Sequence, residues 1–138
     1  MSKIAFPRME VLRMLDELTA DITPNRFITT RPNAVGNGMQ EFLLISLSNI
    51  EDSADTYQHT RGRISIFARD VQGTGAGGDA VSGMENTLRL DEMLNAVTGL
   101  FPMVTELFHG KRPQLLAGGS DDAGFHYLTI QFNITILK

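Results

Sequence analysis

The stretch from Phe125 to Lys138 constrains the fold of this chain more than any other part of it. Apolar and polar residues alternate along it, and side chains that alternate in this way lie on opposite faces of a β-strand. One face is expected to carry His126, Leu128, Ile130, Phe132, Ile134 and Ile136, and the other Tyr127, Thr129, Gln131, Asn133 and Thr135. The stretch therefore predicts one long strand, which needs neighbouring strands and an apolar layer over its apolar face.

Shorter stretches upstream also favour strands. An apolar run, or a β-rich segment bounded by Gly, Pro, Asn and Ser, is typical of this structure. The predicted strands are Arg26–Arg31 near a sheet edge, Glu41–Leu47 buried on both faces, Arg61–Val71, and two short strands, Val104–His109 and Gln114–Ala117, around a turn at Gly110–Pro113. Within Arg61–Val71, one face is expected to carry Ile64, Ile66 and Ala68, and the other Arg63, Ser65, Phe67 and Arg69.

Two segments have the spacing of an amphipathic helix, in which apolar residues recur every three or four positions. The first starts after Pro7 and ends at Thr23–Asn25, with apolar residues Val11, Leu12, Leu15, Leu18 and Ile22, of which Val11, Leu15, Leu18 and Ile22 are expected to face the sheet. The second runs from Met84 to Phe101, with an apolar stripe of Leu90, Leu94, Val97 and Phe101, flanked by Met93 and Leu100. Pro102 is expected to end it.

These elements predict an α+β fold. A helix, about three strands, a second helix and two or three further strands favour a mainly antiparallel sheet with both helices packed on one face. Residues 50–60 are expected to form a polar connection, and residues 72–83, which are rich in glycine, a mobile loop. At 138 residues, the whole chain, 1–138, is expected to be a single domain.

Composition excludes several classes of function. The chain has no cysteine, so a disulfide framework, a thiol nucleophile and a cysteine metal site are not available. Its formal net charge of −4 argues against binding nucleic acid through bulk charge, so such binding would need a local basic patch. No apolar run approaches the roughly 20 residues that cross a bilayer. The N-terminal residues also lack the apolar core of a signal peptide, which predicts a soluble, intracellular protein with no membrane partner.

The segment Gly73-Thr74-Gly75-Ala76-Gly77-Gly78 matches the pattern G-x-G-x-x-G between a predicted strand and a predicted helix. A dinucleotide-binding fingerprint has this position. However, the helix is expected to start only several residues later, no second strand with a terminal acidic residue follows, and no Lys-Ser or Lys-Thr pair makes a P-loop. A surface loop that orders against a partner is therefore the favoured interpretation, and no cofactor is predicted.

A metal site is also considered and not predicted. Asp121, Asp122 and His126 lie close together in the sequence. A stable site needs three or four ligands with supporting contacts, and His59 and His109 are isolated from this segment along the chain. A histidine at the margin of the core, hydrogen-bonded to the backbone, is the favoured interpretation of His126.

The sequence gives no support for catalysis. Glu51, Asp52 and Asp55 could pair as carboxylates, but no apolar flank would raise the pKa of one of them. No serine has the G-x-S-x-G surroundings of a nucleophile elbow. We therefore expect that the protein is not an enzyme and predict no catalytic residues.

Basic residues gather in two places. Arg61, Arg63 and Arg69 share one predicted strand, and Lys111 and Arg112 share a predicted turn. These residues could contact phosphates in the lumen of a ring. A row of arginines on the solvent face of a strand usually only keeps that face soluble, and this is the favoured interpretation.

Two segments resemble a known family. Arg61–Asp70 is a strand that begins with basic residues, alternates isoleucine and ends in Phe-Ala-Arg-Asp, and a glycine-rich gap and a helix follow it. Gly124–Phe132 begins an aromatic-rich terminal strand. Together with the N-terminal helix, this order is similar to that of the small tail-completion, or tail-terminator, proteins of tailed phages and prophages. Neck proteins share much of the pattern.

The resemblance implies a structural protein that forms a homo-oligomeric ring, usually a hexamer. Such a ring caps the tail tube, stops its growth and joins it to the head connector. The implied partners are further copies of the chain, the tail-tube protein and a head-connector or neck protein, with DNA only as passing cargo that is not bound specifically. An acidic ring would repel the DNA and let it slide. The implied location is the virion tail or neck, or the bacterial cytoplasm during assembly.

Two alternatives remain open. One is another neck or head–tail joining component, or a component of a phage-like contractile device. The other is a small α+β domain that binds a ligand in a cleft between sheet and helices.

Overall fold

The C-terminal strand is the centre of the sheet. A computed structural model describes residues 5–30, 38–52, 57–74 and 80–137. In it, β9 (Phe125–Leu137) pairs antiparallel with β4 (Tyr57–Arg69) on one side and with β8 (Phe108–Ser120) on the other. The predicted long strand is thus confirmed as far as Leu137, and it has the two strand neighbours that it needs.

Shorter strands and two helices complete the fold. They are α1 (Arg8–Leu18), β1 (Arg26–Ile28), β2 (Glu41–Leu47), β3 (Glu51–Asp52), β5 (Val71–Thr74), β6 (Ala80–Met84), α2 (Thr87–Thr98) and β7 (Met103–Val104). The main sheet has the order β1-β2-β4-β9-β8-β7, with β3 beside β4. Its β1–β2 pair is parallel and its other pairs are antiparallel, which confirms the mainly antiparallel sheet and the short edge strand at β1.

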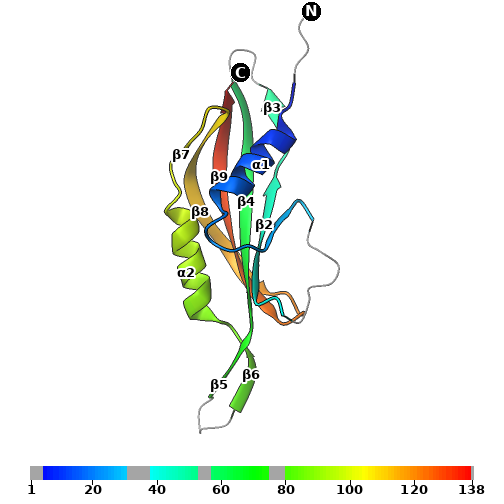
Figure 1. Cartoon of the computed structure of the whole chain (residues 1–138), viewed down its shortest axis with the longest axis vertical. Helices are drawn as coiled ribbons and strands as arrows, with labels where there is room; N and C mark the ends of the chain where they lie inside the picture. Colours follow the sequence, from blue (N-terminus) through cyan, green and yellow to red (C-terminus); the bar gives the residue numbers. More distant parts are fainter. Residues whose placement is uncertain (1–4, 31–37, 53–56, 75–79, 138) are drawn as a thin grey trace, which may run out of the picture.

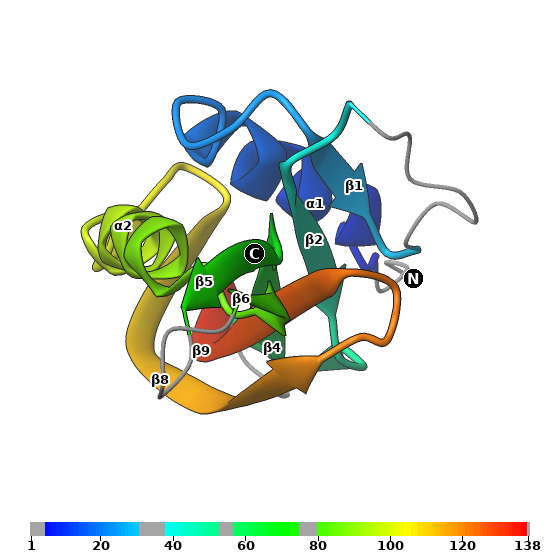
Figure 2. The same cartoon turned by 90° about the horizontal axis from the view of Figure 1, so that it is seen from below.

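Both helices lie on one side of the curled sheet, α1 across β2 and α2 along β4 and β9 (Figures 1 and 2). The apolar faces of the helices pack on the sheet in one core. In the sheet, Ile45 of β2, Ile64 of β4 and Ile130 of β9 lie opposite one another in one row of this core. The buried helix residues are Val11, Leu12, Leu15, Leu90, Met93 and Val97. Because burying an aliphatic side chain contributes about 1.5–3 kcal/mol, this layer holds the helices on the sheet. The predicted α+β arrangement is confirmed.

The prediction of which α1 side chains face the sheet is wrong at one residue, Leu18. Val11 and Leu15 are buried as predicted, and Leu12 is buried with them. Leu18, the last residue of α1, is 36% exposed. Ile22, four residues beyond, lies outside the helix and packs half-buried against the core.

The second helix is shorter than predicted. Met84 belongs to β6, and α2 starts at Thr87 after Asn86, whose side-chain oxygen accepts a hydrogen bond from the Arg89 backbone N–H at 3.3 Å. An asparagine that accepts from the first helical turn is a favourable N-cap. The cap therefore sets where the helix begins.

An ion pair fastens α2 to β2. The Arg89 guanidinium donates to both carboxylate oxygens of Glu41 at 2.7 Å, and its Nη2 also donates to the carbonyl of Ile22 at 3.2 Å. A two-point pair of this kind is stronger than a single hydrogen bond. The hydrogen bonds and charge of Arg89 lower the pKa of Glu41, although partial burial acts in the opposite direction. Glu41 in turn raises the pKa of Arg89.

The connection predicted at residues 50–60 is wrong in its described part, and residues 53–56 lie outside the described residues. Glu51 and Asp52 form β3, which pairs with His59 and Gln58 of β4, and β4 begins at Tyr57. The start of β4 has few apolar residues on its helix-facing side, so the alternating pattern was not visible there. In the fold, the buried Gln58 amide donates to the carbonyl of Ala5 at 2.7 Å and to Asp52 at 3.2 Å, which satisfies its polar group.

The two short strands predicted between Val104 and Ala117 are also wrong. A single strand, β8, runs without a break from Phe108 through the predicted turn to Ser120, and β7 takes only Met103 and Val104. The predicted turn is a bulge, since the register with β9 shifts between Lys111 and Gln114 and Arg112 has a φ of 59°. A bulge accommodates Pro113, which cannot donate to the sheet.

The glycine-rich loop predicted at residues 72–83 is wrong in its described part. Strands β5 and β6 pair as an antiparallel hairpin that projects beyond the end of the main sheet (Figure 1). Residues 75–79 of the predicted loop lie outside the described residues.

Candidate functional site

The sheet face opposite the helices changes character along the strands. At the end where β4 finishes, it carries an apolar cluster of Phe42, Phe67 and Phe125. At the end where β4 starts, it carries basic and polar side chains over an open groove. The same face is thus sealed at one end and available to solvent at the other.

The aromatic end is closely packed. The Phe42 ring stacks on Phe67 with centroids 4.3 Å apart and meets Phe125 edge-on at 5.3 Å. The Arg69 guanidinium lies 4.6 Å from the centroid of Phe125, and its Nε donates to the carbonyl of Met39 at 3.0 Å. Arg69 is therefore separate from the other basic residues and helps to cover this cluster.

Strand register builds the basic end in rows. Arg61 of β4 and Lys111 of β8 both pair opposite Asn133 of β9. Arg63 pairs opposite Gln131, whose side-chain oxygen accepts from the Arg63 Nε at 3.0 Å. Because alternate residues of a strand share a face, these side chains all lie on the side away from the helices.

Two histidines extend this face by a further row. His59 of β4 and His109 of β8 both pair opposite Thr135 of β9. Both histidines were expected to be isolated from the segment of Asp121, Asp122 and His126, and His126 lies at the other end of β9, opposite Ala68 and Ser120. His59 and His109 flank the same threonine on neighbouring strands, next to the row of Arg61 and Lys111.

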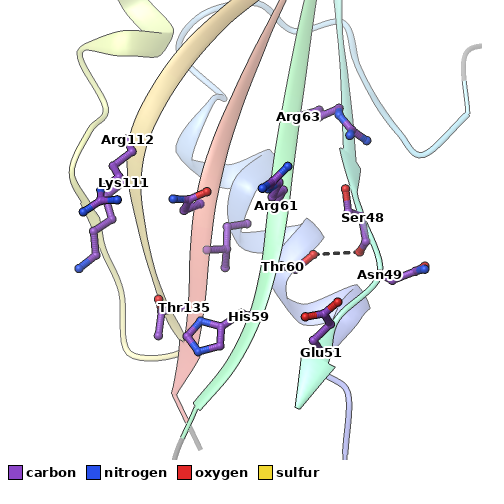
Figure 3. A pocket seen from close by; sticks show the side chains of 12 residues that line it. Ser48, Asn49, Glu51, His59, Thr60, Arg61, Arg63, Lys111, Arg112 and Thr135 are labelled. Carbon is purple, nitrogen blue, oxygen red and sulfur yellow. Dashed lines mark hydrogen bonds between the residues drawn. The ribbon is translucent and has the colours of Figure 1, made fainter. Parts of the chain in front are cut away.

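The rows surround a groove of about 620 Å³. Figure 3 shows Arg61 and Arg63 extending from β4, and Lys111 and Arg112 from β8, on the two sides of β9. Among the described residues, the groove is lined by Ser48, Asn49, Glu51, His59, Thr60, Arg61, Arg63, Lys111, Arg112, Asn133, Ile134 and Thr135. The groove is therefore mainly polar and basic, with Glu51 at its margin.

Unlike Arg26 and Arg89, the cations of the groove form no ion pair with a carboxylate of the described residues. Arg26 pairs with Asp16 at 2.8 Å, and Arg89 pairs with Glu41. Within residues 5–30, 38–52, 57–74 and 80–137, no carboxylate forms an ion pair with any of four groove cations. These are Arg61, Arg63, Lys111 and Arg112.

Two of the residues considered for a metal site, His126 and Asp121, have structural partners. His126 bonds through Nδ1 to Asp70, and Asp121 accepts the backbone N–H groups of Ala123 and Phe125 at 2.8 and 3.0 Å. Asp121 thus shapes the turn before β9. Over the described ranges, no three His, Asp or Glu side chains converge in a way that could hold a metal ion. His126 was expected to form a hydrogen bond to the backbone, and this interpretation is wrong because its partner is the Asp70 carboxylate.

The other candidate segments also take structural positions. Glu51 borders the groove and Asp52 accepts from Gln58, while Asp55 lies outside the described residues. Gly73 and Thr74 of the G-x-G-x-x-G segment belong to β5, and its other four residues are not described. Strand β6 stands between that segment and α2, so the strand–loop–helix order of a dinucleotide site is not present.

The groove was not predicted from the sequence, because this requires both the true length of β4 and the register of β8 against β9. The alternation of Arg63 and Arg69 continues back through Arg61 and His59 to Tyr57, which is a signal for a longer strand. The contribution of β8, however, depends on the register of a bulged strand, which no local pattern gives.

Comparison with known proteins gives no family for this chain, because no family model and no curated protein matches its sequence. Of the two helices that the structure describes, neither is long and apolar enough to cross a membrane.

Proposed function

We propose that this chain is a structural tail-completion protein of a tailed phage or prophage. Copies of it form a ring that caps the tail tube and joins it to the head connector, in the virion or in the host cytoplasm during assembly. The likeness of its sequence pattern to that family supports this proposal, and the α+β fold is compatible with it. The observation that carries it in the structure is the outer edge of β8.

This edge is long and accessible. Strand β7 pairs only with His109 and Gly110, and in the described part of the chain no strand pairs with the outer side of β8 beyond them. Two exposed apolar side chains lie at this margin of the sheet, Leu115 of β8 at 52% exposure and Val104 of the short β7 at 72%. An unpaired strand edge can extend its sheet into another molecule, and adjacent apolar side chains add buried area.

The two edges of the sheet differ, which favours a ring. One edge is the long β8 and the other is the three-residue β1, which runs parallel to its neighbour. A contact that joins unlike surfaces of successive copies is heterologous, and it produces a closed ring when the rotation closes. The projecting β5–β6 hairpin is a second element that can contact a neighbour or a stacked partner (Figure 1).

The first test is the molar mass of the chain by light scattering over a range of concentrations, with electron microscopy of any assembly. Leu115→Lys should weaken assembly, because it places a charge beside the β8 edge. Leu88→Lys is the matched control, since Leu88 is 73% exposed on α2 and outside this edge. Equal losses for both variants would contradict the assignment of the edge.

The second test addresses the tail directly. Tail-tube protein from the same genome is allowed to polymerise with and without the chain. The proposal predicts tubes that stop growing when the chain is added and that carry it at one end. Tubes of unchanged length, with the chain absent from their ends, would show that the proposal is wrong even if rings form.

A further inference from the structure

We propose that the groove between β4 and β8 binds the backbone phosphates of duplex nucleic acid without reading its sequence. Its four cations lie on one face of one chain, and the inference does not require ring formation. The chain as a whole carries a net charge of −4, so this groove is a local basic area on an acidic protein.

The charge pairing of the arginines is the first reason. Arg26 and Arg89 are bound to carboxylates, and Arg69 covers an aromatic ring. The groove cations have no such partner among the described residues, although the chain contains more acidic than basic residues. Arg8 and Arg13 also lack a described ion pair, but they lie on α1, away from the groove. Cations that are grouped without paired carboxylates attract an external anion, and phosphates release condensed counterions when they are neutralised.

The geometry of the rows is the second reason. Arg61 and Arg63 are two residues apart on β4, which places their Cα atoms about 7 Å apart. Arg61 and Lys111 are separated by the one intervening strand, and two strand spacings give about 10 Å. Long arginine and lysine side chains at such distances can reach several phosphates of one backbone. The Asn133 and Thr135 side chains between them can donate further hydrogen bonds to phosphate oxygens.

The lining also favours a nucleic acid over a protein partner. The only aliphatic residue among the described lining is Ile134, which is 1% exposed. Protein interfaces usually have an apolar centre with few charges, whereas surfaces that bind nucleic acid are polar and positively charged.

A duplex is favoured over a single strand. Proteins that bind single strands without sequence preference stack the bases on aromatic side chains. The described lining contains no Phe, Tyr or Trp. The groove also offers no element that could enter the major groove, so contacts to base edges are not expected.

The test uses the full chain and a fluorescein-labelled duplex DNA of arbitrary sequence, with anisotropy measured over a series of salt concentrations. Each phosphate contact contributes about 0.9 to the slope of log K against log salt, so wild-type protein should give a slope of about −2 to −4. Arg61→Gln combined with Lys111→Gln should reduce the magnitude of this slope by about 2.

The matched control is Arg8→Gln combined with Arg13→Gln. Both residues are exposed on α1, on the other side of the sheet, and this pair removes the same number of positive charges. The control should keep the wild-type slope. If both double variants lose affinity equally, or if the wild-type protein does not bind at about 20 mM salt, where such contacts are strongest, the proposal is wrong.

Two competitors separate the ligand classes. Polyglutamate of matched charge should compete weakly; if it binds more tightly than the duplex, the groove instead takes an acidic protein segment. A single strand with the same number of phosphates should also bind more weakly than the duplex, and the opposite order would overturn the duplex assignment. The measurement uses the chain alone, so it can fail while tube capping succeeds, or the reverse.

Discussion

The two ends of the open sheet face use arginine in different ways. At the aromatic end, Arg69 lies over Phe125 and donates to Met39, so its charge is part of the packing. At the groove end, Arg61 lies exposed in a row with Asn133 and Lys111. One strand, β4, supplies both arginines with the same alternation. The difference shows that the neighbours given by the register, and not the residue type, decide whether an arginine stabilises the fold or stays available to a ligand.

The two ends of this face should therefore respond differently to substitution. Substitutions at the aromatic end should change stability, while substitutions at the groove end should change binding and leave stability almost unchanged. The largest expected effects therefore belong to the phenylalanines.

Phe42→Ala should lower the free energy of unfolding by about 3–5 kcal/mol, the usual cost of removing a buried phenylalanine. Phe42 is fully buried and contacts Phe67, Phe125 and Phe27 with ring centroids 4.3, 5.3 and 5.8 Å away. Urea unfolding followed by circular dichroism measures the change. A loss below about 1 kcal/mol, the scale of a surface change, would mean that this cluster is not part of the stable core.

Behind the groove, Gly62→Ala should cost about 1–3 kcal/mol, because it overpacks the helix-facing side of β4. A Cβ atom at Gly62 would clash with Cζ of Phe132, so the buried ring must move. The neighbouring residue, Arg61, faces the groove and provides the comparison on the opposite face. Thermal unfolding of Gly62→Ala and Arg61→Ala should therefore give a clear loss for the first and almost none for the second.

The sequence was informative where one face of a strand is continuously apolar. Ile64, Ile66 and Ala68 were assigned correctly, and so was the alternation of β9 from Leu128 to Ile136, because these apolar residues all belong to the core beneath the helices. Prediction failed at Gln58 and Thr60, where buried polar groups are satisfied by distant partners, Ala5 and Ser48. It failed again at β8, because a bulge resembles a turn in the sequence.

The candidate site was only partly visible for the same reason. The basic residues were recognised, but their grouping depends on pairing between strands. Arg61, Arg63 and Arg69 share one face of β4, yet Arg69 belongs to the aromatic end. Lys111 joins Arg61 only because both pair with Asn133, and a one-residue shift of register would have placed Lys111 on the helix side.

Glu41→Gln should cost about 1–2 kcal/mol at pH 7, since it removes the charged partner of Arg89 in a partly exposed pair. The pKa of Glu41 is lowered in the fold from its ordinary value of 4.5. The pair therefore contributes its full stability above pH 4.5 and loses it as the pH falls through the lowered pKa. Urea unfolding at pH 7 and in acid should show the difference between wild type and variant shrinking. An equal difference at both pH values would contradict this electrostatic origin.

The smallest expected change in the free energy of unfolding belongs to the groove end, and it gives the sharpest contrast between the two ends. Arg61→Gln combined with Lys111→Gln should change the free energy of unfolding by no more than about 0.5 kcal/mol, as is usual for surface substitutions without close partners. Removing neighbouring like charges can even stabilise the fold slightly, because their repulsion is relieved. Arg69→Gln is the internal comparison, since it loses both the Met39 hydrogen bond and the contact with Phe125. Urea unfolding of the two variants should give the larger loss for Arg69→Gln, although it changes one residue instead of two. The reverse order would mean that the groove cations stabilise the fold, and the division between a structural end and a binding end of this face would not hold.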